Sequence, residues 1–183
     1  MLLHNQPLRP TQLTTPCVLR RAAGDQLTLQ LRPLPLGFHR RLRERNIVPP
    51  APPLRVARDS NGRPIKDTQG HAVTLSDPHR PEYLAQLEAY HHRVAILSLA
   101  EALSDDPEIR FETLCPNDAA NTTASDQWLA YADALAEELE TAGFTAGDLI
   151  RLCQEICRLS NLFDDHIQTQ AANFSSATPP DTD

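Results

Sequence analysis

Apolar and polar residues alternate near the amino terminus of the chain. The segment QLTLQL at 26–31 places leucine at every second position, the period of a strand with one buried face. Gly24 stands just before it and supplies the backbone freedom that a tight turn requires. The pattern predicts a β-hairpin over residues 17–33, followed by a short helix over about 36–46.

Farther along the chain the apolar spacing becomes that of amphipathic helices. Apolar residues that recur alternately four and three positions apart form one helix face. This spacing predicts three principal helices, over about 81–103, 125–142 and 145–167. Only a tight turn fits between the second and the third predicted helix, because so few residues separate them. We therefore expect these two helices to form an αα-hairpin. Together with the amino-terminal hairpin, these helices predict an α+β fold that is mainly α.

Capping signals stand at the expected ends of these helices. Asp77 and Pro78 form an N-cap and first-turn proline for the first helix. Gly143 has the position of a residue that ends the second helix. Thr145 and Asp148 have the spacing of a capping box for the third.

Composition divides the chain into four segments. IVPPAPP at 47–53 is an extended connector, and the polar stretch after it is an exposed β-arm over about 54–75. We find no internal repeat of fixed period. The predicted segments are a hairpin with a short helix at 1–46, a connector with an arm at 47–79, a helical region at 80–168 and a disordered tail at 169–183.

The apolar faces of the second and third helices predict the core. We expect five aliphatic residues to pack between these two helices: Leu135, Leu139, Leu152, Ile156 and Leu159.

Charge is distributed unevenly along a chain whose formal net charge is −7. Residues 1–58 carry ten arginines against two acids, whereas residues 101–183 carry three arginines against seventeen acids. Such asymmetry favours self-association or a charged partner, and the acids of the second half disfavour nucleic acid. The residues that we expect to contact a partner are the arginine cluster and two aromatic residues: Arg40, Arg41, Arg43, Arg45, Trp128 and Tyr131.

No motif predicts catalysis, a cofactor or a metal site. Cys153 and Cys157 share a helix face, but their neighbours on it are mostly apolar, so a core role is favoured. His91 and His92 are adjacent and point about 100° apart, so both cannot reach one ion. No apolar run reaches the length of a membrane helix, and the first residues lack the features of a secretory signal. We therefore expect a cytoplasmic protein that is not an enzyme.

The order of these segments resembles a family of known proteins. LPLGFHRRL at 34–42 and the Pro-rich connector precede PEYLAQLEAYHHRVAILSLAEAL, and WLAYADALAEELETAGFTAGDLIRLCQEICRLSNL follows at 128–162. In this last segment an acidic helix, an Ala-Gly-Phe-Thr turn and a helix ending in Leu-Ser-Asn-Leu come in succession. The layout is similar, over about residues 16–165, to that of tail assembly chaperones of long-tailed bacteriophages and prophages.

The resemblance implies a role in tail morphogenesis. Such a chaperone binds the tape-measure protein, keeps that long helical chain soluble, recruits tail-tube protein and is absent from the mature particle. It implies no catalytic residues. Two alternatives remain open: a structural tail-completion or connector component of the virion, whose arm inserts into a neighbour, and a nucleic-acid-associated regulator that uses the arginines of 40–45.

Overall fold

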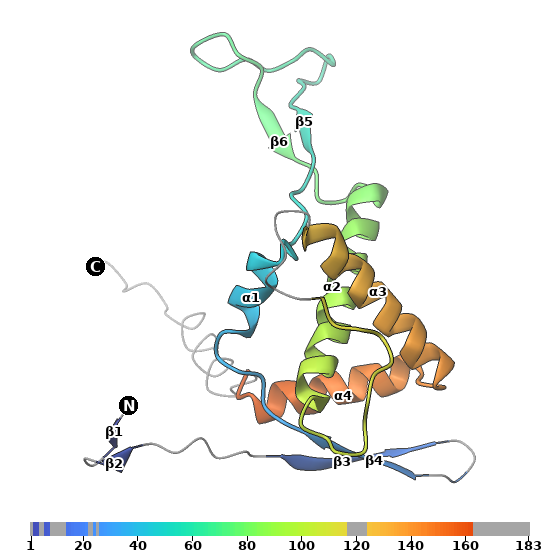
Figure 1. Ribbon diagram of the computed structural model, residues 1–183. Helices are drawn as coiled ribbons and strands as arrows, with labels where there is room; N and C mark the ends of the chain where they lie inside the picture. Colours follow the sequence, from blue (N-terminus) through green and yellow to red (C-terminus); the bar gives the residue numbers. More distant parts are fainter. Residues whose placement is uncertain are drawn as a thin grey trace, which may run out of the picture. The chain divides into compact units, whose positions relative to one another are not determined.

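The computed structural model describes residues 2–3, 6–7, 14–21, 24, 26–116 and 124–162 of the chain. These residues form helices and small antiparallel sheets, which confirms the predicted α+β, mainly α fold (Figure 1). The predicted tail at 169–183 lies outside them. The strands are β1 (Leu2–Leu3), β2 (Gln6–Pro7), β3 (Thr15–Arg20), β4 (Gln26–Leu31), β5 (Leu54–Val56) and β6 (Thr74–Ser76). The helices are α1 (Phe38–Glu44), α2 (Pro81–Leu103), α3 (Ala124–Thr141) and α4 (Ala146–Leu159).

The chain divides into two compact units. The first comprises residues 1–38, 97–112 and 138–183, and the second comprises residues 39–96 and 113–137. The β3–β4 hairpin and α4 belong to the first unit, whereas most of α1 and the β5–β6 hairpin belong to the second. Helices α2 and α3 each contribute residues to both.

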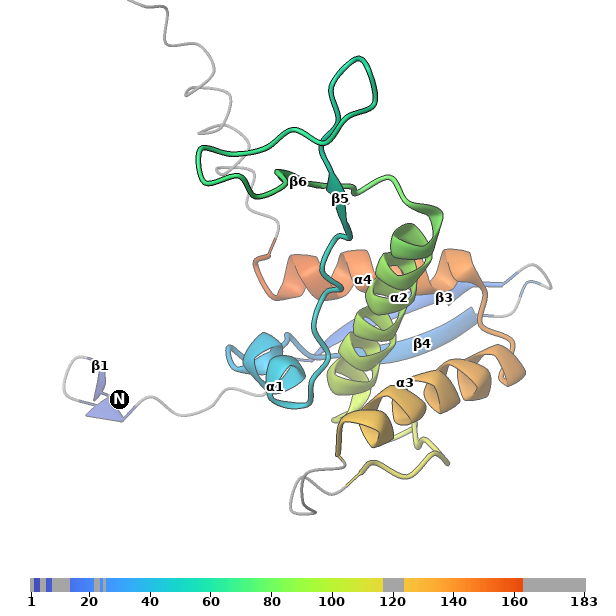
Figure 2. The same ribbon diagram turned by 90° about the horizontal axis from the view of Figure 1, so that it is seen from above.

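The predicted amino-terminal hairpin is present, with strands at 15–20 and 26–31. Leu19 pairs with Leu27, and Cys17 pairs with Leu29. Because side chains alternate between the two faces of a strand, Leu19 and Leu29 share one face, and both are buried. Helix α4 lies alongside β3 (Figure 2) and buries Leu152 against the core of the first unit.

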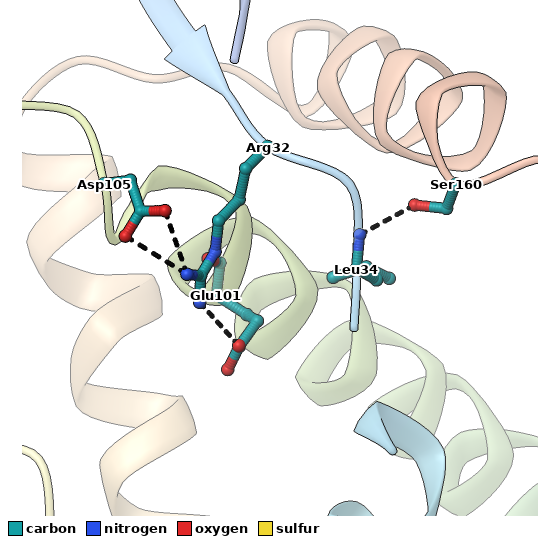
Figure 3. A network of polar contacts seen from close by, with 5 residues as sticks. All are labelled: Arg32, Leu34, Glu101, Asp105 and Ser160. Carbon is teal, nitrogen blue, oxygen red and sulfur yellow. Dashed lines mark hydrogen bonds and ion pairs between the residues drawn. The ribbon is translucent and has the colours of Figure 1, made fainter. Parts of the chain in front are cut away.

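The segment that leaves β4 is tied to the carboxyl ends of two helices (Figure 3). The guanidinium of Arg32 donates to the backbone carbonyl of Glu101 at 2.9 Å and to its carboxylate at 2.7 Å. It also donates to Asp105 at 3.0 Å, and the amide of Leu34 donates to the hydroxyl of Ser160 at 2.9 Å. An arginine is favoured here because the last turn of a helix exposes unpaired carbonyls of partial negative charge.

The turn between α3 and α4 has the predicted caps. Gly143 adopts a positive φ of 81°, and the amide of Phe144 donates to the carbonyl of Leu139 at 3.0 Å, the bond that ends a helix in a Schellman motif. Thr145 then caps α4: its hydroxyl accepts from the amide of Asp148, while its own amide donates to the Asp148 carboxylate at 3.0 Å. The predicted capping box is confirmed.

Helix α4 is shorter than the prediction of 145–167, which is wrong at its carboxyl end. The helix stops at Leu159, since Asn161 turns to a positive φ of 52°. The amide of Leu162 then donates to the carbonyl of Cys157 at 2.9 Å. Asparagine tolerates this left-handed conformation better than other non-glycine residues, so it ends the helix as glycine does after α3.

The cap predicted for α2 at Asp77 and Pro78 is wrong. Asp77 and Pro78 precede the helix, which starts at Pro81. The amide of Asp77 donates instead to the carbonyl of Pro53 at 2.8 Å, closing the base of the β5–β6 hairpin. Pro81 takes the first helical position, where a missing amide hydrogen costs nothing.

The second unit has a core of its own. Its α2 and α3 segments are joined by Arg93, whose guanidinium donates to both oxygens of the Asp133 carboxylate at 2.8 and 2.9 Å. The buried apolar side chains of this unit are Leu42, Ile47, Ala57, Ile96, Trp128, Ala132, Leu135 and Ala136. Of the five residues predicted to pack between the last two helices, Leu135, Leu139, Leu152 and Ile156 are buried and Leu159 is half-buried.

Candidate functional site

Three of the six predicted contact residues lie together in the second unit. The guanidinium of Arg45 lies over the ring of Trp128, 3.6 Å from its centroid. The rings of Trp128 and Tyr131 meet edge to face at 5.5 Å, with an interplanar angle of 88°. Trp128 is only 2% exposed and is therefore a core residue. Arg45 and Tyr131, which contact it, are half-buried and lie at the rim of the cluster.

The remaining predicted contact residues lie on α1. Arg40 is exposed and lies 3.5 Å from the Glu44 carboxylate, one helical turn away. Arg43 is exposed, and Arg41 is half-buried. Their role in partner binding stays a prediction, because the geometry by itself assigns them no ligand.

An incompletely covered apolar seam runs along the first half of α2, in the second unit. Tyr83, Leu87 and Tyr90 lie on one face of the helix and are half-buried, and Leu84 beside them is 48% exposed. Tyr83 also lines a hollow of about 190 Å³ with Ala51, Pro53, Arg80, Glu82 and Gln86. No large residue of α2 before Ile96 is fully buried, so this stretch retains apolar surface that another polypeptide could cover.

The arm, residues 54–76, is the most regular feature of the second unit. Two consecutive octapeptides, ARDSNGRP at 57–64 and IKDTQGHA at 65–72, form its two terminal loops (Figure 1). Each octapeptide has aspartate third and glycine sixth. The expectation that the chain contains no repeat of fixed period is therefore wrong for this segment. The signal was present in the sequence as two Asp-x-x-Gly motifs spaced eight residues apart.

The two loops also share a hydrogen-bond pattern. In each, the aspartate Oδ1 accepts from the backbone amides two and four positions later, at 2.9 and 2.8 Å. These aspartates are Asp59 and Asp67. The glycines, Gly62 and Gly70, adopt φ values of 79° and 86°, a conformation that side-chain-bearing residues rarely reach.

A closed cycle of backbone hydrogen bonds joins the loops to the hairpin. The amide of Ala57 donates to the carbonyl of Val73, that of Val73 to Ile65, and that of Ile65 to Ala57, at 2.8, 2.8 and 2.9 Å. These three residues are eight positions apart. Each octapeptide therefore begins at one residue of the cycle, and the residue that follows it is the next member of the cycle. The tip is therefore held by backbone polar groups and needs little apolar core.

The arm exposes large apolar side chains. Leu54 is 66% exposed, and Val56, Ile65 and Leu75 are also exposed. A two-stranded ribbon with three residues in each strand cannot bury these side chains within itself. Among the described residues these side chains stay exposed, so they offer apolar surface that another molecule could cover.

A second hollow lies in the first unit, between β3 and α4. It has a volume of about 420 Å³ and is lined by Pro16, Cys17, Val18, Leu19, Arg151, Gln154, Glu155 and Arg158. Arg158 is paired with Glu155 at 2.8 Å. Burial raises the pKa of the Cys17 thiol, the negative charge of Glu155 raises it further, and Arg151 opposes them. The thiol is therefore held in its neutral form, which is a poor nucleophile.

The described residues offer little for metal or thiolate chemistry. Burial, with a smaller contribution from Cys157, raises the pKa of Cys153 to about 11. Within the described ranges, no three His, Cys, Asp or Glu side chains are grouped as metal ligands would be. In the same ranges, no helix has the length and apolar character needed to cross a membrane.

Comparison with known proteins leaves the family open. A scan against protein-family models, a search of curated proteins and a search of solved structures each found no match to this chain. The function must therefore be argued from the surfaces described above and from the layout of the sequence.

Proposed function

We propose that the protein is a tail assembly chaperone that acts by binding another polypeptide and catalyses no reaction. Its partner would be the tape-measure protein of a bacteriophage or prophage, and the complex would recruit tail-tube subunits. The chaperone would act in the cytoplasm of the host or lysogen and be absent from the finished particle. This partner comes from the resemblance in sequence layout.

The observation that carries the proposal is the incompletely covered apolar seam of α2. Tyr83, Leu87 and Tyr90 recur at the spacing of a helix face, and Leu84 widens the face. A helix laid along this face would bury the exposed parts of these side chains, which is the usual way an amphipathic helix is held in a groove. A tape-measure chain is long and helical, so it would offer such a helix.

The test is co-expression with a long helical tape-measure chain, which the proposal expects to find encoded in the same genomic neighbourhood. We expect the partner to be insoluble alone and to co-purify with this protein when both are present. Leu84→Asp should abolish co-purification, because the aspartate would have to be buried without a partner. The matched control is Ile150→Asp on α4, where the parent side chain is 59% exposed but lies in the first unit. A partner that stays insoluble with the parent protein would overturn the proposal.

The arm favours a second candidate, a structural tail-completion or connector component. A preformed, two-looped ribbon with exposed Leu54 and Leu75 is suited to insertion into a neighbouring subunit. Quantitative mass spectrometry of purified particles separates the two roles. A connector would be present in fixed stoichiometry, whereas a chaperone would be missing.

A further inference from the structure

The arm carries cations that no acid among the described residues neutralises. Arg55, Arg63 and Lys66 are exposed and form no ion pair with any residue that the structure describes. The arm holds two acids, Asp59 and Asp67, against four cations in all, so its formal charge is +2. The arm is therefore a basic ribbon with apolar side chains between its charges.

Helix α3 carries the opposite charge on its outer face. Asp126, Asp133, Glu137 and Glu140 follow at steps of seven, four and three residues, so they share one face, and all four are exposed. Asp133 is paired with Arg93, whereas the other three make no ion pair among the described residues. From Asp133 to Glu140 this acidic face extends about 10 Å along the helix axis.

We propose that the arm of one copy binds the acidic face of α3 on a second copy of this chain. Arg55, Arg63 and Lys66 would pair with the acids, and Leu54 and Leu75 would be covered by the same contact. The occupant is identified by charge complementarity: the unneutralised cations and the unneutralised acids belong to the same sequence. Charge complementarity of this kind orients partners and speeds their association.

The contact joins two different surfaces, so it is heterologous. Each copy keeps a free arm at one side and a free acidic face at the other, and repetition gives a ring or an open filament. This interface does not rest on the tape-measure proposal, because it concerns the protein alone. A nucleic acid is disfavoured as the occupant, since the chain as a whole carries a net charge of −7.

The experiment is sedimentation velocity of the purified full chain over a range of concentrations. We expect association that weakens between about 0.05 and 0.5 M salt, because exposed ion pairs are screened. Arg55→Glu/Lys66→Glu, and separately Glu137→Lys/Glu140→Lys, should each raise the apparent Kd roughly tenfold or more, since attraction becomes repulsion at two positions. Arg20→Glu/Arg110→Glu changes the net charge as the arm variant does, at exposed sites outside the arm, and should leave association unchanged.

Mixing the two interface variants is the decisive step. In the arm variant both the arm and α3 are acidic, and in the helix variant both are basic, so neither variant attracts its own copies. In the mixture, the acidic arm of the first variant meets the basic α3 of the second, and the basic arm of the second meets the acidic α3 of the first. The mixture should therefore associate as the parent does. A parent protein that stays monomeric at low salt, variants that associate like the parent, or a mixture that stays monomeric would each overturn the proposal. Low-salt binding to a DNA duplex that the arm variant loses, with no self-association, would assign the arm to nucleic acid instead.

Discussion

The guanidinium of Arg45 lies 3.6 Å from the centroid of the Trp128 ring. Arg45 follows α1, and Trp128 lies in the first turns of α3, so one contact joins segments more than eighty residues apart. Trp128 is the only tryptophan in the chain and is almost completely buried. It therefore reports on this contact without interference from other indoles.

Replacing Arg45 by alanine should expose the indole. We expect the fluorescence of Trp128 to shift to longer wavelength and its quenching by acrylamide to increase. The free energy of unfolding should fall by about 0.5–2 kcal/mol, the usual range for a cation–π pair together with the packing of the arginine stem. Arg43→Ala, at an exposed position on α1, is the control and should leave both fluorescence and stability as in the parent. Unchanged quenching in Arg45→Ala would show that the arginine does not shield the ring.

Helix α4 offers a matched pair of isoleucines. Ile156 is 1% exposed and belongs to the core of the first unit, whereas Ile150 on the same helix is largely exposed. Ile156→Ala should lower the free energy of unfolding by about 2–5 kcal/mol, and Leu139→Ala should fall in the same range. Ile150→Ala should change it by less than about 0.5 kcal/mol. Chemical denaturation measures all three, and equal losses at the two isoleucines would contradict the assigned buried face.

The capping box at the start of α4 predicts a pH dependence. The backbone amide of Thr145 and then its hydroxyl donate to Asp148, which holds the pKa of that carboxyl below its usual range. The ionised carboxylate is therefore favoured by folding. Its stabilising effect is complete above the unfolded-state pKa near 4 and is lost as the pH falls through the lower folded-state pKa.

Asp148→Ala should accordingly lower the free energy of unfolding by about 1 kcal/mol at pH 7. As the pH falls below about 4 the difference from the parent should shrink, because the parent loses the same interaction on protonation. Denaturation curves at pH 7, 4 and 3 test this expectation. Glu140→Ala removes an exposed acid without such bonds and serves as the control. A difference that grows as the pH falls would contradict the assigned direction of the pKa shift.

The loops of the arm should open independently of the core. Asp59→Ala removes the acceptor of two backbone amides in the first octapeptide. We expect faster hydrogen exchange at 59–63, no change in the second loop at 67–71, and a thermal midpoint close to that of the parent. Ser60→Ala in the same loop is the control. Loss of protection throughout the arm would show that the two loops fold as one unit.

The sequence predicted the elements whose signals are local. The apolar spacing along α2 predicted residues 81–103, although its cap was placed too early, at Asp77 and Pro78, and alternating leucines located the β3–β4 hairpin. The end of α4 was missed because LSNLF continues the apolar pattern, while the backbone turns at Asn161. The contact of Arg45 with Trp128 depends on tertiary packing, which no local pattern encodes. The octapeptides of the arm carried a usable signal that hydrophobic periodicity does not detect, since their regularity lies in aspartate and glycine.

The cycle formed by Ala57, Ile65 and Val73 also makes the tip of the arm modular. Each loop departs from this cycle and returns to it after eight residues, so exchanging one loop for another of equal length leaves the alignment of β5 with β6 intact. The loops themselves are closed by a single aspartate and a single glycine apiece. We therefore expect this segment of about two dozen residues to keep its geometry when it is grafted onto an unrelated antiparallel hairpin. Exchange of single loops would then change the binding surface at the tip while the helices stay as they are.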